Sequence, residues 1–171
     1  MKDNIVVITG SSKGIGLATS MKFLSSGYIV HGVDLEQGTI QHKNYIHHRV
    51  DITEYDNLPD IDDVNYLINN AGIQSNDISV ISTNLIALMK VTEKYGLQPN
   101  IKSIVNVGSV SAHTGEEFPW YAASKGGLLP YTKAIANEIA KYGATCNSIS
   151  PGGVLTELNQ PVIDDKECWN K

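Results

Sequence analysis

Short apolar runs separated by helical patterns are the feature that most limits how this chain can fold. The runs are rich in Val and Ile, and four are nearly continuous hydrophobic stretches, which is typical of strands buried on both faces of a parallel sheet. We expect strands at IVVIT (5–9), YIVHGV (28–33), YIHHRV (45–50), VNYLIN (64–69), IVNVG (104–108) and TCNSIS (145–150).

Helical patterns lie between several of these runs. We expect helices at 15–26, 79–95 and 120–142, each followed at once by a glycine that can end a helix. Pro130 should kink or locally open the last helix, because proline has no N–H to donate. Strands that alternate with helices, without a second compositional zone, predict a single doubly wound α/β domain over residues 1–171.

Composition argues against several other classes of protein. A chain of 171 residues suits one domain, and a net charge of -5 lacks the basic footprint of a nucleic-acid binder. No apolar run is long enough to span a bilayer and no leader pattern begins the chain, so we expect a cytoplasmic protein without a membrane partner. Cys146 and Cys168 show neither metal-ligand nor disulfide spacing, so we expect two reduced thiols and no metal.

A glycine-rich segment, TGSSKGIG at 9–16, lies between the first predicted strand and the first predicted helix. Gly10, Gly14 and Gly16 permit a tight turn and let the backbone approach a ligand closely. The N–H groups at the helix start and the positive end of the helix dipole suit a pyrophosphate. This segment therefore predicts a dinucleotide site at the end of the first strand.

The expected coenzyme depends on two residues that act in opposite directions. Asp34 ends the second predicted strand, 18 residues after Gly16, where a carboxylate can accept hydrogen bonds from both ribose hydroxyls of an adenosine. It would also repel a 2′-phosphate, which favours NAD, whereas Lys13 beside the loop could attract that phosphate. Because Asp34 is predicted to face the ribose directly, we expect NAD, with NADP as the alternative.

Taken together, these residues resemble the short-chain dehydrogenase/reductase family, and most of all its oxoacyl-reductase and small-alcohol-dehydrogenase branch. The motifs occur in the family's order over nearly the whole chain: TGSSKGIG at 9–16, Asp51 in VDIT, NNAG at 69–72, Asn84 in TNL, Ser109 in VNVGSV, Tyr121 and Lys125 in YAASK, and SPGGVLT at 150–156. The resemblance implies a Rossmann-type parallel sheet of about six strands in the order 3-2-1-4-5-6. It also implies an NAD(P)-dependent oxidoreductase that acts on a small alcohol or carbonyl substrate.

The resemblance makes Tyr121 the general acid or base, and Lys125, four residues on, the group that contacts the nicotinamide ribose. Tyrosine needs a pKa shift of about three units, or roughly 4 kcal/mol, to work near neutral pH. An ammonium at about 4 Å supplies roughly 4 kcal/mol at an effective dielectric of 20, so we expect Lys125 to lower the pKa of Tyr121. Ser109 would polarise the substrate oxygen, and Asn84 would hold a water in a proton relay to Lys125.

The resemblance also implies cofactor contacts along the site, with Asp51 near the adenine and Val154 and Thr156 near the carboxamide and phosphate. The full set of residues expected to bind the cofactor is Gly10, Ser12, Lys13, Gly14, Ile15, Gly16, Asp34, Asp51, Ile52, Asn70, Ala71, Gly72, Tyr121, Lys125, Val154 and Thr156.

Three departures from the family pattern affect these expectations. Ser109 lies 12 residues before Tyr121, one fewer than is usual, so Ser111 is a rival. The regions after the third and fourth predicted strands are short, so their helices should be abbreviated or partly replaced by loops. The chain stops 15 residues after Thr156, which we expect to lie within the substrate-lid region, either in a naturally small member or with residues absent.

Three interpretations of function remain open. The combination of Asn84, Ser109, Tyr121 and Lys125 favours an enzyme, whereas the short C-terminal region favours a non-catalytic dinucleotide sensor or an inactive fragment. If the sheet ends at 145–150, a partner subunit could cover its unpaired edge. The resemblance implies a homodimer or homotetramer.

Overall fold

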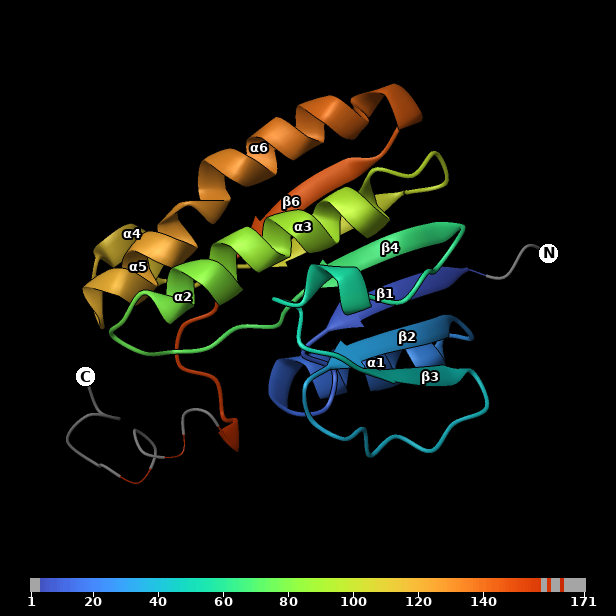
Figure 1. The fold of residues 1–171 in the computed structure, drawn as a ribbon, viewed down its shortest axis with the longest axis horizontal. Coiled ribbons are helices and arrows are strands. Elements are labelled where there is room, and N and C mark those ends of the chain that lie inside the picture. The colour runs from blue at the N-terminus through green and yellow to red at the C-terminus, as the bar shows by residue number, and fades with distance from the viewer. Residues whose placement is uncertain (1–3, 158–159, 161–163, 165–171) are drawn as a thin grey trace.

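Six strands form one parallel sheet in the computed structural model, which describes residues 4–157, 160 and 164. The strand order is β3-β2-β1-β4-β5-β6, which confirms the predicted Rossmann-type arrangement (Figure 1). Each predicted strand is confirmed to within one residue at either end: β1 is Ile5–Thr9, β2 Ile29–Asp34, β3 Tyr45–Arg49, β4 Val64–Asn69, β5 Ser103–Val107 and β6 Thr145–Ile149.

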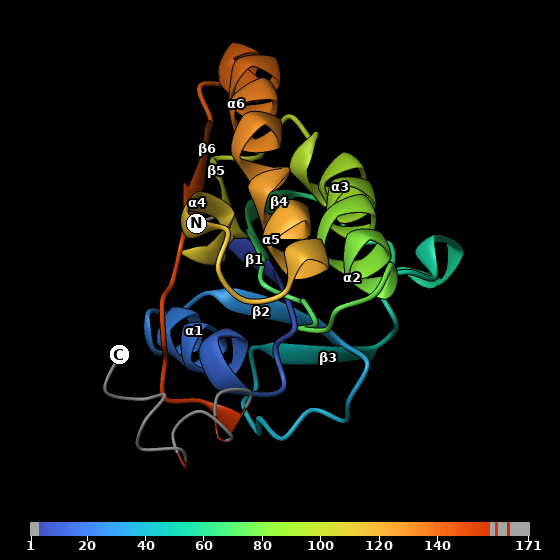
Figure 2. The same ribbon diagram turned by 90° about the vertical axis from the view of Figure 1, so that its left-hand side faces the viewer.

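Helices cover both faces of this sheet (Figure 2). Their bounds are α1 Gly14–Ser25, α2 Ser79–Ile81, α3 Leu88–Val91, α4 Ser111–Thr114, α5 Pro119–Gly126 and α6 Leu128–Ile139, with 3-10 turns η1 Tyr55–Asn57 and η4 Ala140–Tyr142 and π-helical segments η2 Ser82–Ala87 and η3 Thr92–Gly96. In the part of the chain that the structure describes, no helix is long and apolar enough to cross a membrane.

Alternate residues of each central strand enter two separate cores. In β1, Val7 packs toward the α3 and α6 side with Val91 and Ile139, whereas Val6 packs toward α1 with Leu24. All five of these side chains are buried. This burial on both faces explains why the strand sequences are continuous apolar runs rather than alternating patterns.

Two predicted helices differ in detail from the structure. Helical conformation runs from Ser79 to Gly96 as predicted, but it contains the π-helical segments η2 and η3. The helix predicted at 120–142 divides at Gly127, and Pro130 becomes the third residue of α6. A proline is tolerated in a first turn because its missing N–H would have no helical partner there, so the break precedes the proline.

The shortened connections leave one edge of the sheet open for a site. Only η1 lies between β3 and β4, as predicted, and a loop at 70–78 precedes α2. All strands point the same way, so the loops after β1, β2, β4 and β5 meet at their carboxyl edge. The segment after β6 runs along that edge toward α1 (Figure 1). Connections diverge between β1 and β4, which is where such sheets bind ligands.

Candidate active site

A cleft of about 670 Å³ lies at the carboxyl edge of the sheet. Its walls are the glycine loop after β1, the ends of β2, β4 and β5, residues 50–52 after β3, part of α5, and the segment from Pro151 to Glu157. Predicted site residues on its surface are Gly10, Lys13, Gly14, Ile15, Asp34, Asp51, Ile52, Asn70, Ala71, Gly72, Ser109, Tyr121, Lys125, Val154 and Thr156. The other three, Ser12, Gly16 and Asn84, are buried behind it.

The glycine loop is held close to the loop after β4. Gly10 has φ +66°, and a Cβ there would lie 2.8 Å from the Ala71 Cα, so only glycine fits. The Asn70 side chain donates to the carbonyls of Thr9 at 3.1 Å and Gly10 at 3.0 Å. Gly16 serves packing, because a Cβ there would lie 1.9 Å from the Gly10 carbonyl oxygen.

The start of α1 suits an anion. Its N-cap residue is Lys13, whose side chain makes no capping hydrogen bond. The first N–H groups of a helix need hydrogen-bond partners from outside the helix, and they lie at the positive end of its dipole. Gly14 and Ile15 begin the helix and line the cleft. These features fit the pyrophosphate of a dinucleotide.

The carboxylate of Asp34 is oriented by backbone groups at the end of β2. Its Oδ2 accepts from the Ser12 N–H at 2.8 Å, and its Oδ1 accepts from the Glu36 N–H at 2.9 Å. A carboxylate oxygen can accept more than one hydrogen bond, so both oxygens keep capacity for ribose hydroxyls. The position of Asp34 and its remaining capacity to accept hydrogen bonds fit the hydroxyls of an adenosine ribose.

Tyr121 and Lys125 lie one turn apart on α5, as predicted, and both face the cleft. The Lys125 Nζ lies 5.9 Å from the centroid of the Tyr121 ring and donates to the Val107 carbonyl at 2.9 Å. Lys125 is 5% exposed, and burial lowers its pKa to about 8. The ammonium is thus held between the Tyr121 ring and the end of β5.

The expected lowering of the Tyr121 pKa is wrong for this structure. Burial raises the pKa of Tyr121, a hydrogen bond with Ser109 lowers it in part, and the charge of Glu117 raises it further. The Lys125 ammonium donates to the Val107 carbonyl and lies 5.9 Å from the centroid of the Tyr121 ring, and its charge does not offset the desolvation of the phenol. Desolvation of the phenol therefore dominates.

Ser109 and Ser111 differ clearly in position. Ser109 follows β5 and lines the cleft, whereas Ser111 is 1% exposed and lies behind it. The Ser109 hydroxyl donates to the Ser111 hydroxyl at 3.1 Å, and the Ser111 N–H donates back to Ser109 at 3.2 Å. The buried serine therefore orients the one that faces the cleft.

Asn84 anchors the loop after β4. Its Oδ1 accepts from the Ile73 N–H at 2.8 Å, and its Nδ2 donates to the Ile73 carbonyl at 2.9 Å and to Ser124 Oγ at 3.1 Å. Asn84 lies in the π-helical segment η2, and such segments are frequent at functional sites. Both protons of the Asn84 side-chain amide are used in these hydrogen bonds. The predicted water relay through Asn84 stays a prediction.

Charged residues that no motif marks also line the cleft. Glu36 contacts Lys13, and Glu117 accepts a hydrogen bond from Gln74 at 3.0 Å across the cleft. Glu117 has φ +69°, an uncommon conformation for a residue other than glycine. Among the described residues, no group of three or more His, Cys, Asp or Glu could hold a metal.

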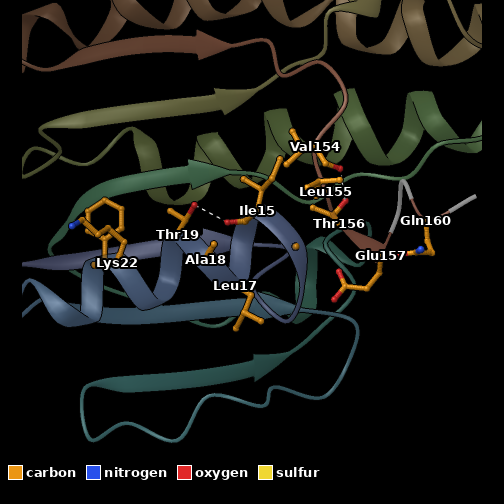
Figure 3. Close-up of a pocket in the computed structure, with 12 residues that line it drawn as sticks. Ile15, Leu17, Ala18, Thr19, Lys22, Val154, Leu155, Thr156, Glu157 and Gln160 are labelled. Carbon is orange, nitrogen blue, oxygen red and sulfur yellow. Dashed lines mark hydrogen bonds between the residues drawn. The ribbon is translucent and has the colours of Figure 1, made fainter. Parts of the chain in front are cut away.

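A second hollow, of about 920 Å³, lies on the outer side of α1 (Figure 3). Residues of α1 such as Ala18 and Phe23 form one wall, and residues 154–157 form the other. Its lining is mainly apolar, with Lys22 and Glu157 as its charged side chains among the described residues. The groups suited to chemistry therefore lie in the cleft rather than here.

Comparisons with known proteins show which sequences and structures this chain resembles. The sequence pattern of the short chain dehydrogenase family matches residues 4–167. The chain is 34% identical to short chain dehydrogenase adrF of Penicillium roqueforti, over 100% of this chain and 77% of that protein. It is 27% identical to the 3-oxoacyl-[acyl-carrier-protein] reductase FabG of Haemophilus influenzae, over 98% and 81%. The structure of a 4-hydroxyisoleucine dehydrogenase complexed with NADH is similar with a TM-score of 0.84, at 26% identity over 98% of this chain and 81% of that one.

Proposed function

Because the chain belongs to the short chain dehydrogenase family, we propose that it transfers a hydride between NAD(H) and a small alcohol or carbonyl compound in the cleft. The observation that carries this proposal is the convergence of Ser109, Tyr121 and Lys125 on a cleft whose other end is the glycine loop. The Tyr121 phenol, the Ser109 hydroxyl and the Lys125 ammonium would thus all lie within reach of one bound nucleotide. The solved structure with NADH and the FabG relative support the same chemistry.

Different residues along the cleft would bind different parts of the dinucleotide. The N-terminus of α1 and the glycine loop would bind the pyrophosphate. Asp34 would accept hydrogen bonds from the adenosine ribose, and Lys125 would donate to the nicotinamide ribose. Gly72 leaves room for the Lys125 ammonium, because a Cβ on residue 72 would lie only 3.3 Å from the Lys125 Nζ. When bound, a reduced nicotinamide supplies the hydride that adds to the carbonyl carbon.

Three side chains manage the oxygen of the substrate. The Ser109 hydroxyl, which donates to Ser111 in the structure, would turn to donate to the carbonyl oxygen and polarise the C=O bond, while the Ser111 N–H keeps donating to Ser109. Tyr121 then gives its phenolic proton to that oxygen as negative charge develops, so the carbonyl becomes an alcohol. The buried ammonium of Lys125 stabilises the tyrosinate left behind, because charges interact strongly where water is excluded.

The electrostatics of the protein without nucleotide favour reduction. Burial raises the Tyr121 pKa, so this residue is a protonated acid at neutral pH. Oxidation of an alcohol needs Tyr121 as a base, so it should require added positive charge from the oxidised nicotinamide. We therefore expect faster carbonyl reduction than alcohol oxidation at neutral pH.

Replacement of Tyr121 by phenylalanine tests the proposal. NADH binding would be measured by calorimetry, and NADH oxidation would be followed with acetoin, ethyl acetoacetate and acetoacetyl-N-acetylcysteamine as probes. We expect wild-type protein to oxidise NADH with at least one probe. Tyr121→Phe should bind NADH within about twofold of wild type and lose activity by at least about 10²-fold, because general acid catalysis contributes about 10²–10⁴-fold.

Two results would go against this account. Full activity in Tyr121→Phe would show that another group supplies the proton. NADH binding by wild type without turnover of any probe would favour a dinucleotide-binding sensor over an enzyme.

A further inference from the structure

An ion pair at the adenosine end of the cleft joins the glycine loop to the end of β2. The Lys13 Nζ lies 2.5 Å from the Glu36 Oε1, and both side chains are 56% exposed and line the cleft. Sequence alone made Lys13 a candidate partner for a 2′-phosphate. In the structure its charge is directed to Glu36 instead, and this hydrogen bond raises the pKa of Lys13.

The backbone of Glu36 is fixed from several sides. Its N–H donates to Asp34 Oδ1 at 2.9 Å, and its carbonyl accepts from Ser12 Oγ at 3.4 Å. The His47 Nε2 accepts from the Gly38 N–H at 3.0 Å and lies 3.0 Å from the same carbonyl, so it does not also donate to that carbonyl. Exposed ion pairs are usually weak, in part because two mobile side chains must be ordered. The backbone contacts of Glu36 fix where its side chain begins, beside the glycine loop.

Negative charge dominates this end of the cleft. Among the described residues that line it there, Lys13 is the only cation, whereas Asp34, Glu36, Asp51 and Glu157 are carboxylates. A 2′-phosphate would add further negative charge next to Asp34. With Lys13 held by Glu36, no other cation among the described residues lines this end of the cleft; Arg49 lies outside the lining and donates its Nε to the Leu35 carbonyl at 3.1 Å.

We propose that Glu36 is a coenzyme-selecting residue, which withholds Lys13 from a 2′-phosphate and adds its own charge against that group. The proposal rests on the proposed function, since it assumes that a dinucleotide lies in the cleft. In this arrangement Asp34 recognises the ribose hydroxyls, and Glu36 rejects the phosphorylated ribose. Selection thus uses repulsion as well as attraction.

Nucleotide affinities of matched variants test this role. NADH and NADPH would be titrated by calorimetry into wild type, Glu36→Gln, the double variant Glu36→Gln/Lys13→Gln, and Glu93→Gln. Glu93 is the control, because its pair with Lys90, at 2.8 Å and similarly exposed, lies on α3 and η3 outside the cleft. Melting temperatures of all four proteins would show whether either pair supports the fold.

We expect Glu36→Gln to bind NADPH about tenfold more tightly than wild type and NADH within about twofold. The gain should shrink as salt rises and should largely disappear in the double variant, which has the same net charge at this pair as wild type and no Lys13 to attract the phosphate. Glu93→Gln should bind both nucleotides as wild type does.

The alternative outcomes separate the two proposals. Wild type that binds NADH, with unchanged NADPH affinity in Glu36→Gln, overturns the selecting role and leaves the proposed function standing. A lowered melting temperature with equal loss of both affinities makes the pair structural and also overturns it. Wild type that binds neither nucleotide overturns the proposed function, and the selecting role with it.

Discussion

Replacement of Lys125 by methionine should make the protein more stable at neutral pH while removing a charged group from the candidate active site. Lys125 is 5% exposed, and its ammonium donates to one backbone carbonyl, that of Val107. Burial lowers its pKa from 10.5 to about 8. A shift of this size corresponds to about 3 kcal/mol of destabilisation at pH 7, where the lysine is charged in both folded and unfolded states.

Methionine has similar length and no charge to bury, so it removes this desolvation cost. It also leaves the Val107 carbonyl without its donor, which costs about 1–2 kcal/mol. The net gain for Lys125→Met at pH 7 is therefore about 1–2 kcal/mol. Because active sites hold strained or buried polar groups at the expense of stability, a gain here would identify Lys125 as such a group.

The pH dependence is the sharper part of this prediction. A lysine whose pKa is lowered in the folded state binds fewer protons there than in the unfolded state between about pH 8 and 10.5, so the wild-type protein gains stability as pH rises through that window. Lys125→Met lacks the titrating amine and cannot gain this stability. The stability difference between variant and wild type should fall by about 2 kcal/mol from pH 8 to pH 10.

Urea denaturation at pH 7, 8, 9 and 10 measures this difference directly. Lys133, exposed on α6, supplies the control, because an exposed substitution such as Lys133→Met changes the free energy of unfolding by less than about 0.5 kcal/mol. A difference between Lys125→Met and wild type that stays constant from pH 8 to pH 10 would refute the assignment of a buried, partly neutralised ammonium.

Two further substitutions probe how the loops around the cleft are held. Gly16→Ala should lower NADH affinity by more than about 100-fold, because its Cβ would lie 1.9 Å from the Gly10 carbonyl oxygen. Gly126→Ala is the control and should bind NADH normally, because the nearest neighbour of its Cβ would lie 3.9 Å away. Equal NADH affinity in both variants would contradict the close packing of the glycine loop. Asn84→Ala removes three buried hydrogen bonds and should cost about 2–4 kcal/mol in urea denaturation, and the Ile73 amide should lose protection from hydrogen exchange. Unchanged protection at Ile73 would show that Asn84 does not anchor this loop.

Most of the fold could be predicted because burial on both faces leaves a direct trace in sequence. A strand such as β1 is apolar from Ile5 to Ile8, and a loop that must approach a ligand closely favours glycine. The π-helical segment around Asn84 leaves no such trace, and the hydrogen bond of Asn84 to Ile73, 11 residues away, is not marked by any local pattern. The position of the helix break was missed for a similar reason, since Pro130 fits the first turn of α6.

The site was predicted less completely than the fold. Tyr121 and Lys125 share a helix face, which spacing alone predicts, but the partner of Lys125 is the Val107 carbonyl, a backbone group that sequence does not mark. The direction of the Tyr121 pKa depends on burial, which spacing does not show. Glu36 and Lys13 are 23 residues apart, and only the meeting of β1 and β2 brings them together.

NMR titration of ¹³Cζ-labelled tyrosine, with and without NAD⁺, tests most directly whether a nicotinamide lies beside Tyr121. Tyr121→Phe identifies the signal by its loss. In the protein alone, the Tyr121 signal should titrate above the ordinary tyrosine pKa, because burial raises it. Saturating NAD⁺ should move that titration to lower pH, because a positive nicotinamide favours the tyrosinate. A Tyr121 signal that NAD⁺ leaves unchanged in position and titration would contradict the account.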